Sequence, residues 1–213
     1  PPTPSPKVAQ TEPGWTNLLA AVDVSRDSLM SPWRLTDGVL RSPIDPGSGG
    51  GHQTLGFSIP NPSRNYDLRY RISRNSSGFG IILPFVRGDE SPSVVADGGH
   101  GFGLAESRGR KSKQDKNWFP PDGSVHEVLI EVRERHVRVK FDGAMQEERA
   151  GALPPGQGDR AFYRSDKVKG PIFGIGVCKG NITVRSAEFR AVDAAAENRA
   201  ALFAAHPRLL QIE

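Results

Sequence analysis

The carboxylates of Glu127 and Glu131 are the side chains whose spacing first suggests acid–base chemistry. Glycoside hydrolysis in its common form needs two carboxylates about 5–9 Å apart across the scissile bond. These two lie four residues apart on one face of a predicted strand, about 13 Å at a rise of roughly 3.3 Å per residue, which is too far for a retaining pair. Because Arg133, Arg138 and Lys140 share that face, we expect a solvated surface of ion pairs here and no catalytic pair.

A glycine-rich stretch, ADGGHGFGLAESRG at positions 96–109, is the most unusual part of the sequence. Glycines let the backbone approach a ligand closely, and they leave Asp97 and His100 as accessible polar groups in a loop. A sugar site on a β-sandwich typically combines hydrogen bonds to hydroxyls with an aromatic surface, which Phe102, Trp118 or Phe119 could supply. The alternative is a tight turn between strands with an exposed histidine, and the sequence leaves both interpretations open.

The densest basic run, RGRKSKQDK, begins at Arg108 and is followed by Trp118 and Phe119. A basic patch beside an aromatic ring can hold phosphate or an anionic polysaccharide. A loop solvated by its own lysines is the commoner outcome for such a run. The net charge of +4 is modest, and the sequence shows no recognition helix or RNA-binding strand motif, so we expect no nucleic-acid partner.

The sequence lacks the familiar motifs for metal, nucleotide and serine-hydrolase sites. Its five histidines show no paired spacing, and Asp97 among glycines is not a coordination sphere, so we predict no metal and no cofactor. No Gly-x-Ser-x-Gly elbow occurs, and Cys178, the single cysteine, lies in an apolar stretch typical of a buried, inert thiol. Because no run of about 18 apolar residues occurs, we expect no membrane insertion.

The elements that must position these residues are mainly strands, and the clearest is the segment VHEVLIEVRERHVRVKFD, residues 125–142. Apolar and polar residues alternate in both halves, which is the period of a β-strand. A turn centred on Glu134 and Arg135 places three apolar pairs opposite one another, with Glu131 opposite Arg138. The pairs are Val132 with Val137, Ile130 with Val139 and Val128 with Phe141. A slip of one residue would expose the whole apolar row, so the register is well specified.

A second hairpin is predicted in YDLRYRISRNSSGFGIILPFV, residues 66–86, with its turn at Asn75–Gly78. Residues 79–86 are apolar on both faces and indicate an inner strand that ends or bulges at Pro84. Further strands are expected at Trp33–Leu40, Gly56–Ile59, Ser93–Ala96, Gly101–Ala105, Pro171–Cys178 and Ile182–Arg190. The 24 glycines and 18 prolines punctuate these short strands, which favours an antiparallel sandwich or barrel over an α/β fold.

The ends of the chain differ in composition from this strand-rich middle. Residues 1–14 form a Pro-rich stretch typical of an extended linker, so we expect this piece to belong to a larger polypeptide. The sandwich domain is expected over residues 15–192. Asp193 precedes a run of helix formers that ends at Pro207, which predicts one short helix within residues 193–213.

Four segments, in order, resemble the concanavalin A-like, laminin-G-like jelly-roll superfamily, and within it the bacterial 3-keto-disaccharide hydrolase family. They are WRLTDGVLRS at 33–42, YDLRYRISRNSSGFGIIL at 66–83, VHEVLIEVRERHVRVKFDG at 125–143 and GIGVCKGNITVRSAEFR at 174–190. The resemblance implies an all-β, two-sheet jelly-roll sandwich that contacts carbohydrate. Two positions depart from the family pattern, since Ile81-Ile82 follow the Asn75–Gly78 turn and Val125-His126 replaces the usual Trp-Asn.

These departures make a non-catalytic carbohydrate-binding module our leading interpretation. An enzyme acting on 3-keto-glycosides and a protein-interaction scaffold are the alternatives, because the fold alone does not determine the function. The predicted ligand surface joins the turn after the strand at 66–74, the glycine-rich loop and the basic-aromatic segment. Its residues are Asn75, Asp97, His100, Arg108 and Trp118.

Overall fold

The computed structural model describes most of the predicted sandwich. The described residues are 12–29, 32–43, 52–59, 64–76, 79–96, 102–105, 118–151, 172–178 and 180–193, with Ala195 and Glu197. Of the predicted ligand surface, Asn75 and Trp118 fall within these ranges. Asp97, His100 and Arg108 lie outside the described residues.

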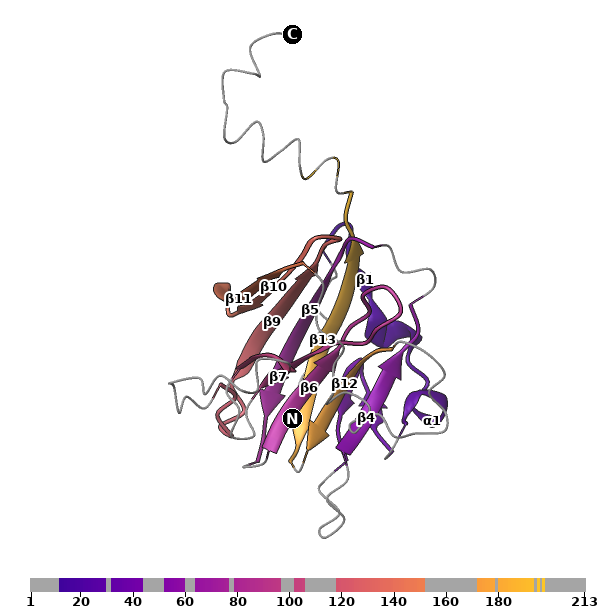
Figure 1. Cartoon of the computed structure of the whole chain (residues 1–213). Helices are drawn as coiled ribbons and strands as arrows, with labels where there is room; N and C mark the ends of the chain where they lie inside the picture. Colours follow the sequence, from indigo (N-terminus) through magenta and orange to yellow (C-terminus); the bar gives the residue numbers. More distant parts are fainter. Residues whose placement is uncertain are drawn as a thin grey trace.

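Two antiparallel sheets make up the described fold (Figure 1). The eight-stranded sheet runs β11 (Ala144–Ala150), β10 (His136–Phe141), β9 (Val125–Val132), β5 (Tyr66–Arg74), β13 (Ile182–Ala191), β3 (Val39–Arg41) and β2 (Arg34–Thr36), and β1 (Thr16–Asn17) pairs with β13. The five-stranded sheet runs β4 (His52–Phe57), β12 (Phe173–Cys178), β6 (Phe79–Pro84), β7 (Ser93–Ala96) and β8 (Phe102–Leu104). The prediction of an all-β, two-sheet antiparallel sandwich is confirmed.

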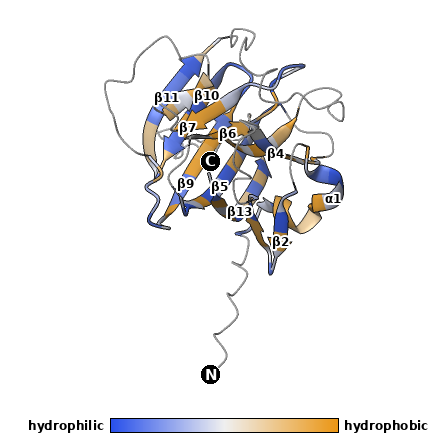
Figure 2. Ribbon diagram, turned by 90° about the horizontal axis from the view of Figure 1, so that it is seen from below, coloured by the Kyte–Doolittle hydropathy of each residue, from blue (hydrophilic) through white to orange (hydrophobic). Residues whose placement is uncertain are grey.

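The hairpin predicted at 125–142 is present with the predicted register. β9 and β10 pair Val132 with Val137, Ile130 with Val139 and Val128 with Phe141, and Glu131 lies opposite Arg138. The apolar members of these pairs are almost completely buried, while bands of hydrophobic and hydrophilic residues alternate along the strands (Figure 2). Burial of one alternating row therefore determines this register, as the pattern predicted.

The second predicted hairpin, at 66–86, is wrong as a hairpin although both of its strands exist. β5 lies in the larger sheet between β9 and β13, whereas β6 lies in the smaller sheet between β12 and β7. Both edges of β5 are already paired, so the chain after Arg74 passes to the other sheet. A strand–turn–strand sequence looks the same for a reversal within one sheet and for a connection between two sheets.

One apolar core fills the space between the sheets. Tyr66, Leu68, Tyr70 and Ile72 of β5 are at most 1% exposed, and they belong to a buried cluster that includes residues of both sheets. The Tyr70 hydroxyl donates to the Gly174 carbonyl of β12 at 3.2 Å, which gives this buried polar group a partner. Burial raises the pKa of Tyr70 above its usual value.

A carboxylate joins the two sheets at one margin. The Leu104 N–H of β8 donates to Glu147 Oε2 of β11 at 2.8 Å. Gly103 makes this approach possible, because a Cβ at this position would collide with the same carboxylate oxygen, and its φ of +149° suits glycine. We call this contact the β8–β11 seam.

Helix is scarce in the described residues. A 3-10 helix at Leu18–Ala21 and the short α1 at Val24–Asp27 precede β2, and Asp23 caps α1 through the N–H groups of Ser25 and Arg26. At the other end, Asp193 accepts from the Ala195 N–H at 2.9 Å, which is the cap expected there. Positions 198–213 of the predicted helix and tail lie outside the described residues. Within the described ranges, no helix is long and apolar enough to cross a membrane.

Candidate functional site

Asn75 lies at the end of the sandwich where β5 finishes and β9 begins. Its backbone N–H donates to the Asn181 carbonyl at 3.0 Å, and its side-chain amide donates to Thr183 Oγ1 at 2.9 Å. Asn75 also lies against Gly123, since a Cβ at Gly123 would be 3.6 Å from Asn75 Oδ1. The exposed amide is therefore held next to the segment that enters β9.

Trp118, the other predicted site residue, lies nearby in a cluster of aromatic rings. Its ring centroid is 5.1 Å from those of Phe102 and Phe141, and Phe119 lies 5.3 Å from Phe141. Trp118 is only 6% exposed and belongs to the core. In this arrangement the ring supports the end of the sandwich and presents little surface to a ligand.

Three residues between these two features form a chain of hydrogen bonds that the sequence analysis missed. Ser124 Oγ lies 2.9 Å from His126 Nε2, and His126 Nδ1 lies 2.8 Å from Asp142 Oδ2. Ser124 immediately precedes β9, His126 is the second residue of β9, and Asp142 follows the last residue of β10. We call Ser124, His126 and Asp142 the Ser-His-Asp chain, and together with Asn75 they form the rim site.

The strand geometry explains why these residues meet. Alternation places His126 on the face of Val128 and Ile130, which points towards the other sheet. The register that pairs Val128 with Phe141 brings Asp142 opposite Glu127, one residue from His126. The backbone confirms this placement, because the Asp142 N–H donates to the Glu127 carbonyl at 2.9 Å.

Packing holds the imidazole in one orientation. The Phe141 ring stacks on the His126 ring, with a centroid distance of 5.1 Å and an interplanar angle of 25°. The Phe119 ring meets the His126 ring edge-on, with a centroid distance of 5.7 Å and an interplanar angle of 87°. The side chain of His126 remains 19% exposed. The ring is therefore fixed between two aromatic neighbours and is still open to solvent on part of its surface.

The carboxylates around the imidazole are also held by hydrogen bonds. Asp142 Oδ1 accepts from the Glu127 N–H at 2.8 Å, so Asp142 uses one oxygen for the backbone and one for His126. Ser124 donates through its N–H to Asp122 Oδ1 at 2.8 Å. Hydrogen bonds from the Ser124 hydroxyl, followed by its backbone N–H, lower the pKa of Asp122. The single hydroxyl hydrogen of Ser124 thus has two acceptors within reach, Asp122 and His126 Nε2.

This arrangement can accept, donate and transfer protons. A carboxylate oxygen only accepts, so His126 Nδ1 carries the hydrogen directed at Asp142 and Nε2 presents its lone pair to Ser124 in the neutral ring. The order of groups matches the general signature of nucleophile, base and orienting group. The signal in the sequence was Ser-x-His at the start of one strand combined with Asp at the end of the strand paired with it.

The outer face of the larger sheet carries the ion pairs predicted for Glu127 and Glu131. Glu131 accepts from Lys140 at 2.8 Å, and Glu127 accepts from Arg71 at 3.1 Å. Both carboxylates are therefore neutralised by neighbouring cations on a surface. A role as an acid–base pair receives no support from this geometry.

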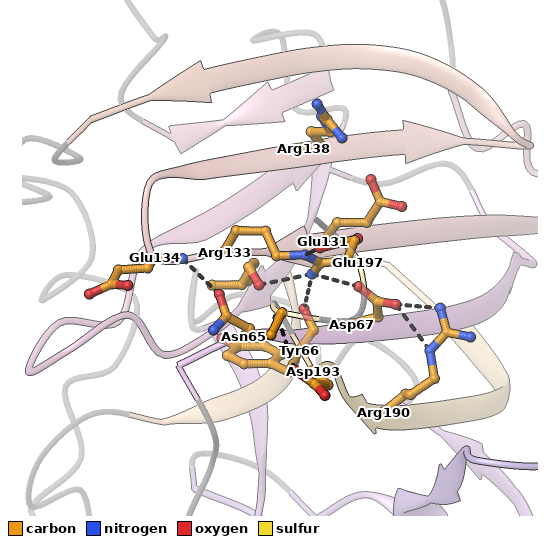
Figure 3. Close-up of polar contacts among 12 residues, drawn as sticks. Asn65, Tyr66, Asp67, Glu131, Arg133, Glu134, Arg138, Arg190, Asp193 and Glu197 are labelled. Atoms are coloured by element: carbon orange, nitrogen blue, oxygen red, sulfur yellow. Dashed lines mark hydrogen bonds and ion pairs between the residues drawn. The ribbon is translucent and has the colours of Figure 1, made fainter. Parts of the chain in front are cut away.

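A more buried network occupies the same face near the end of β9 (Figure 3). Asp67, which is 1% exposed, accepts from Arg133 Nη1 at 2.9 Å and from Arg190 Nη2 at 2.5 Å. Arg133 also contacts Glu197 through Nε at 2.6 Å and Nη2 at 2.7 Å. Burial opposes the charge of Arg133, but the hydrogen bonds to Glu197 and Asp67 raise its pKa overall. We call these four residues the Arg133 network.

The Arg133 network ties the start of the C-terminal segment to the sandwich. Glu197 lies one helical turn after the cap at Asp193, and its N–H donates to the Asp193 carbonyl. The Glu197 carboxylate accepts two hydrogen bonds from Arg133, the residue that follows β9. The hydrogen bond from Arg133 lowers the pKa of Glu197. Every described member of the Arg133 network has a charged partner, so we assign the network a structural role. The rim site is therefore the candidate functional site.

Metal binding receives no support within the part of the chain that the structure describes. No group of three or more His, Cys, Asp or Glu side chains there could hold a metal ion. His126 and Asp142 alone supply too few ligands for a structural or catalytic centre.

Comparisons with known proteins locate the fold. No protein-family model matches the chain, and no curated protein matches its sequence. A provisionally named glycosyl hydrolase from Parabacteroides distasonis aligns with a TM-score of 0.54 and 10% identity, over 84% of this chain and 95% of that one. The exoplasmic/lumenal domain of VIP36, in its Ca²⁺/Man3GlcNAc-bound form, aligns with a TM-score of 0.50 and 13% identity, over 87% of this chain and 89% of that one. At these identities the likeness shows the fold alone, and it agrees with the two-sheet antiparallel sandwich that the sequence predicts.

Proposed function

We propose that the protein binds carbohydrate at the rim site, through hydrogen bonds and without cleavage of a glycosidic bond. The observation that carries this proposal is the presence of an amide, a hydroxyl, an imidazole and a carboxylate at one end of the sandwich, the last three in one hydrogen-bonded chain. These groups belong to Asn75, Ser124, His126 and Asp142. Sugar hydroxyls both donate and accept, so a mixed set of fixed donors and acceptors suits them.

The fold is compatible with this function. The VIP36 domain that shares the sandwich has been solved with Man3GlcNAc bound. A sandwich of this kind presents loops at its ends, where sequence can vary without disturbing the core. Asp97, His100 and Arg108 lie outside the described residues, and their contribution to binding stays a prediction.

Binding is favoured over glycoside hydrolysis because of the state of the carboxylates. Glu127 and Glu131 are paired with Arg71 and Lys140 on an outer face. Asp142 and Asp122 both accept hydrogen bonds from backbone N–H groups. Ion pairs and backbone hydrogen bonds of this kind favour structural roles for these carboxylates over the acid–base roles that glycosidases require. We further propose that the domain serves as the binding module of a larger polypeptide.

Calorimetric titration of the protein with a panel of neutral and acidic oligosaccharides tests the proposal. We expect millimolar or tighter binding to at least one glycan, and a loss of about tenfold in affinity for Asn75→Ala, equivalent to one hydrogen bond of about 1.4 kcal/mol. Gln146→Ala is the matched control, because it removes an amide from β11, on another strand. Absence of binding to every glycan, or equal losses in both variants, would overturn the proposal.

A further inference from the structure

We propose that Ser124, His126 and Asp142 hydrolyse acyl esters, and that the substrate is an ester of a sugar hydroxyl. The ester chemistry follows from the Ser-His-Asp chain alone. The sugar part of the inference rests on the proposed carbohydrate binding at the same rim. Neither part requires the glycosidic bond to be cleaved.

The distances between the groups satisfy the geometry of an activated serine. Ser124 Oγ is 2.9 Å from Nε2, and Nδ1 of the same ring is 2.8 Å from Asp142 Oδ2. A nucleophile within hydrogen-bond reach of a base, whose other nitrogen is oriented by a carboxylate, is the constellation that recurs on unrelated folds. It is recognised by geometry, so the absence of a Gly-x-Ser-x-Gly elbow does not exclude it.

The surroundings hold the base in the productive tautomer. Asp142 is anchored by the Glu127 N–H and receives the hydrogen of His126 Nδ1, which leaves the Nε2 lone pair for Ser124. Phe141 and Phe119 prevent the ring from turning away. Ser124 and the His126 ring are both only partly buried, so an ester carbonyl can approach the serine from solvent.

A purely structural role for the chain would be to pin the start of β9 to the end of β10. Other contacts already hold these two strand ends together. The Asp142 N–H donates to the Glu127 carbonyl, and the Glu127 N–H donates to Asp142 Oδ1. Like the structural Ser25, which bonds to Asp23 through its hydroxyl and its N–H, Ser124 bonds to the aspartate two residues earlier in the chain. Ser124 differs from Ser25 in having His126 Nε2 at 2.9 Å from its hydroxyl oxygen.

The reaction balances with water as the second substrate. Ser124 Oγ attacks the ester carbonyl carbon while His126 Nε2 takes the hydroxyl proton, and the tetrahedral intermediate expels the sugar alkoxide, which receives that proton. Water then attacks the acyl-serine and gives one proton to Nε2, and the intermediate releases the carboxylic acid while the proton returns to Ser124 Oγ.

The ester chemistry is tested with p-nitrophenyl acetate and with a fluorophosphonate that labels activated serines. We expect the label on Ser124 by peptide mass spectrometry, and a rate at least 100-fold lower in Ser124→Ala, in line with the contribution of a positioned base. Ser25→Ala is the matched control and should keep both label and rate. A Ser124 that stays unlabelled, or a Ser124→Ala variant as fast as the unaltered protein, would overturn the inference.

Asp142→Asn tests the positioning role of the carboxylate. The residue has a φ of +47° in the turn with Gly143, and asparagine tolerates this conformation as well as aspartate does. The turn should therefore survive, while the amide can donate to Nδ1 and so favour the wrong tautomer. We expect kcat to fall strongly with KM nearly unchanged and with an unaltered melting temperature. Equal kcat values would contradict the assignment of Asp142.

Glucose pentaacetate separates the sugar part from the ester part. Release of acetate with a higher kcat/KM than from cyclohexyl acetate, a simple ester with an alkoxide leaving group, supports a sugar ester, and a lower value refutes that substrate class. Glycan titration of the unaltered protein keeps the two proposals distinct. Glycan binding by a protein whose Ser124 is labelled supports both, whereas a labelled Ser124 in a protein that binds no glycan refutes carbohydrate binding and leaves the ester chemistry standing.

Discussion

Asp67→Asn tests whether the Arg133 network stabilises the fold. Asparagine keeps the shape of the side chain and removes one negative charge from a site that is 1% exposed. Arg133, whose side chain is 8% exposed, would keep only Glu197 as a carboxylate partner among the described residues. Arg190 is 42% exposed and can be solvated after the change.

The expected loss of stability depends on which arginine stays buried without the Asp67 carboxylate. Breaking a buried ion pair by removing one member costs about 3–5 kcal/mol, because the other charge is left uncompensated. Glu197 continues to compensate Arg133, so we expect the lower end of that range, about 3 kcal/mol. For a domain of this size, one kcal/mol corresponds to roughly 2–4 °C, so the melting temperature should fall by about 6–12 °C.

Urea unfolding and calorimetry of both the unaltered protein and the variant measure this loss. Glu127→Gln is the matched control, because its partner Arg71 is 44% exposed and such surface pairs contribute about 0–1 kcal/mol. Added salt should weaken the Glu127 effect and leave most of the Asp67 effect in place. The reasoning is refuted when Asp67→Asn destabilises the protein no more than Glu127→Gln does.

Three further changes have expected outcomes. Gly174→Ala should lower the free energy of unfolding by about 1–3 kcal/mol in urea, because the new Cβ would collide with the Leu55 carbonyl oxygen. An unchanged free energy would show that β12 and β4 can move apart at little cost. Ile130→Ala, at a fully buried position, should cost about 2–5 kcal/mol, and a cost under 1 kcal/mol would contradict the core described above. The pKa of Glu197 is lowered by Arg133, so its contribution is present above the unfolded pKa of about 4.3 and is lost as the pH falls below that value. Between about pH 5 and pH 3, the unaltered protein should therefore lose more stability than Glu197→Gln, as measured by melting temperature, and parallel curves would contradict this.

The strands could be predicted from the sequence because burial imposes a period of two. The pairing of Ile130 with Val139 follows from that pattern alone, since any other register exposes an apolar row. The partner of β5 could not be predicted in the same way. Its own alternation specifies which face is buried, but β9 and β13 are chosen by packing across the whole sheet.

The candidate site was only partly predictable for a related reason. Asn75 was identified as a polar group in a turn, and the structure places it at the rim, although its part in binding stays a prediction. Trp118 was selected as an aromatic surface, but residue type cannot show that Phe102 and Phe141 pack against it. His126 and Asp142 are 16 positions apart, and they become neighbours only when the hairpin register is carried one residue past the last apolar pair.

The β8–β11 seam has a consequence for how this sandwich behaves at high concentration. Unpaired N–H groups at a strand margin are templates on which another chain can polymerise. At this margin the Leu104 N–H is already occupied by Glu147 Oε2, so an incoming strand would have to displace a carboxylate that also pairs with Arg149 at 3.0 Å. Because Gly103 has no Cβ, the Glu147 carboxylate has room to bind at this edge. Gly103 thereby helps to protect the edge of β8 from pairing with a strand of another molecule.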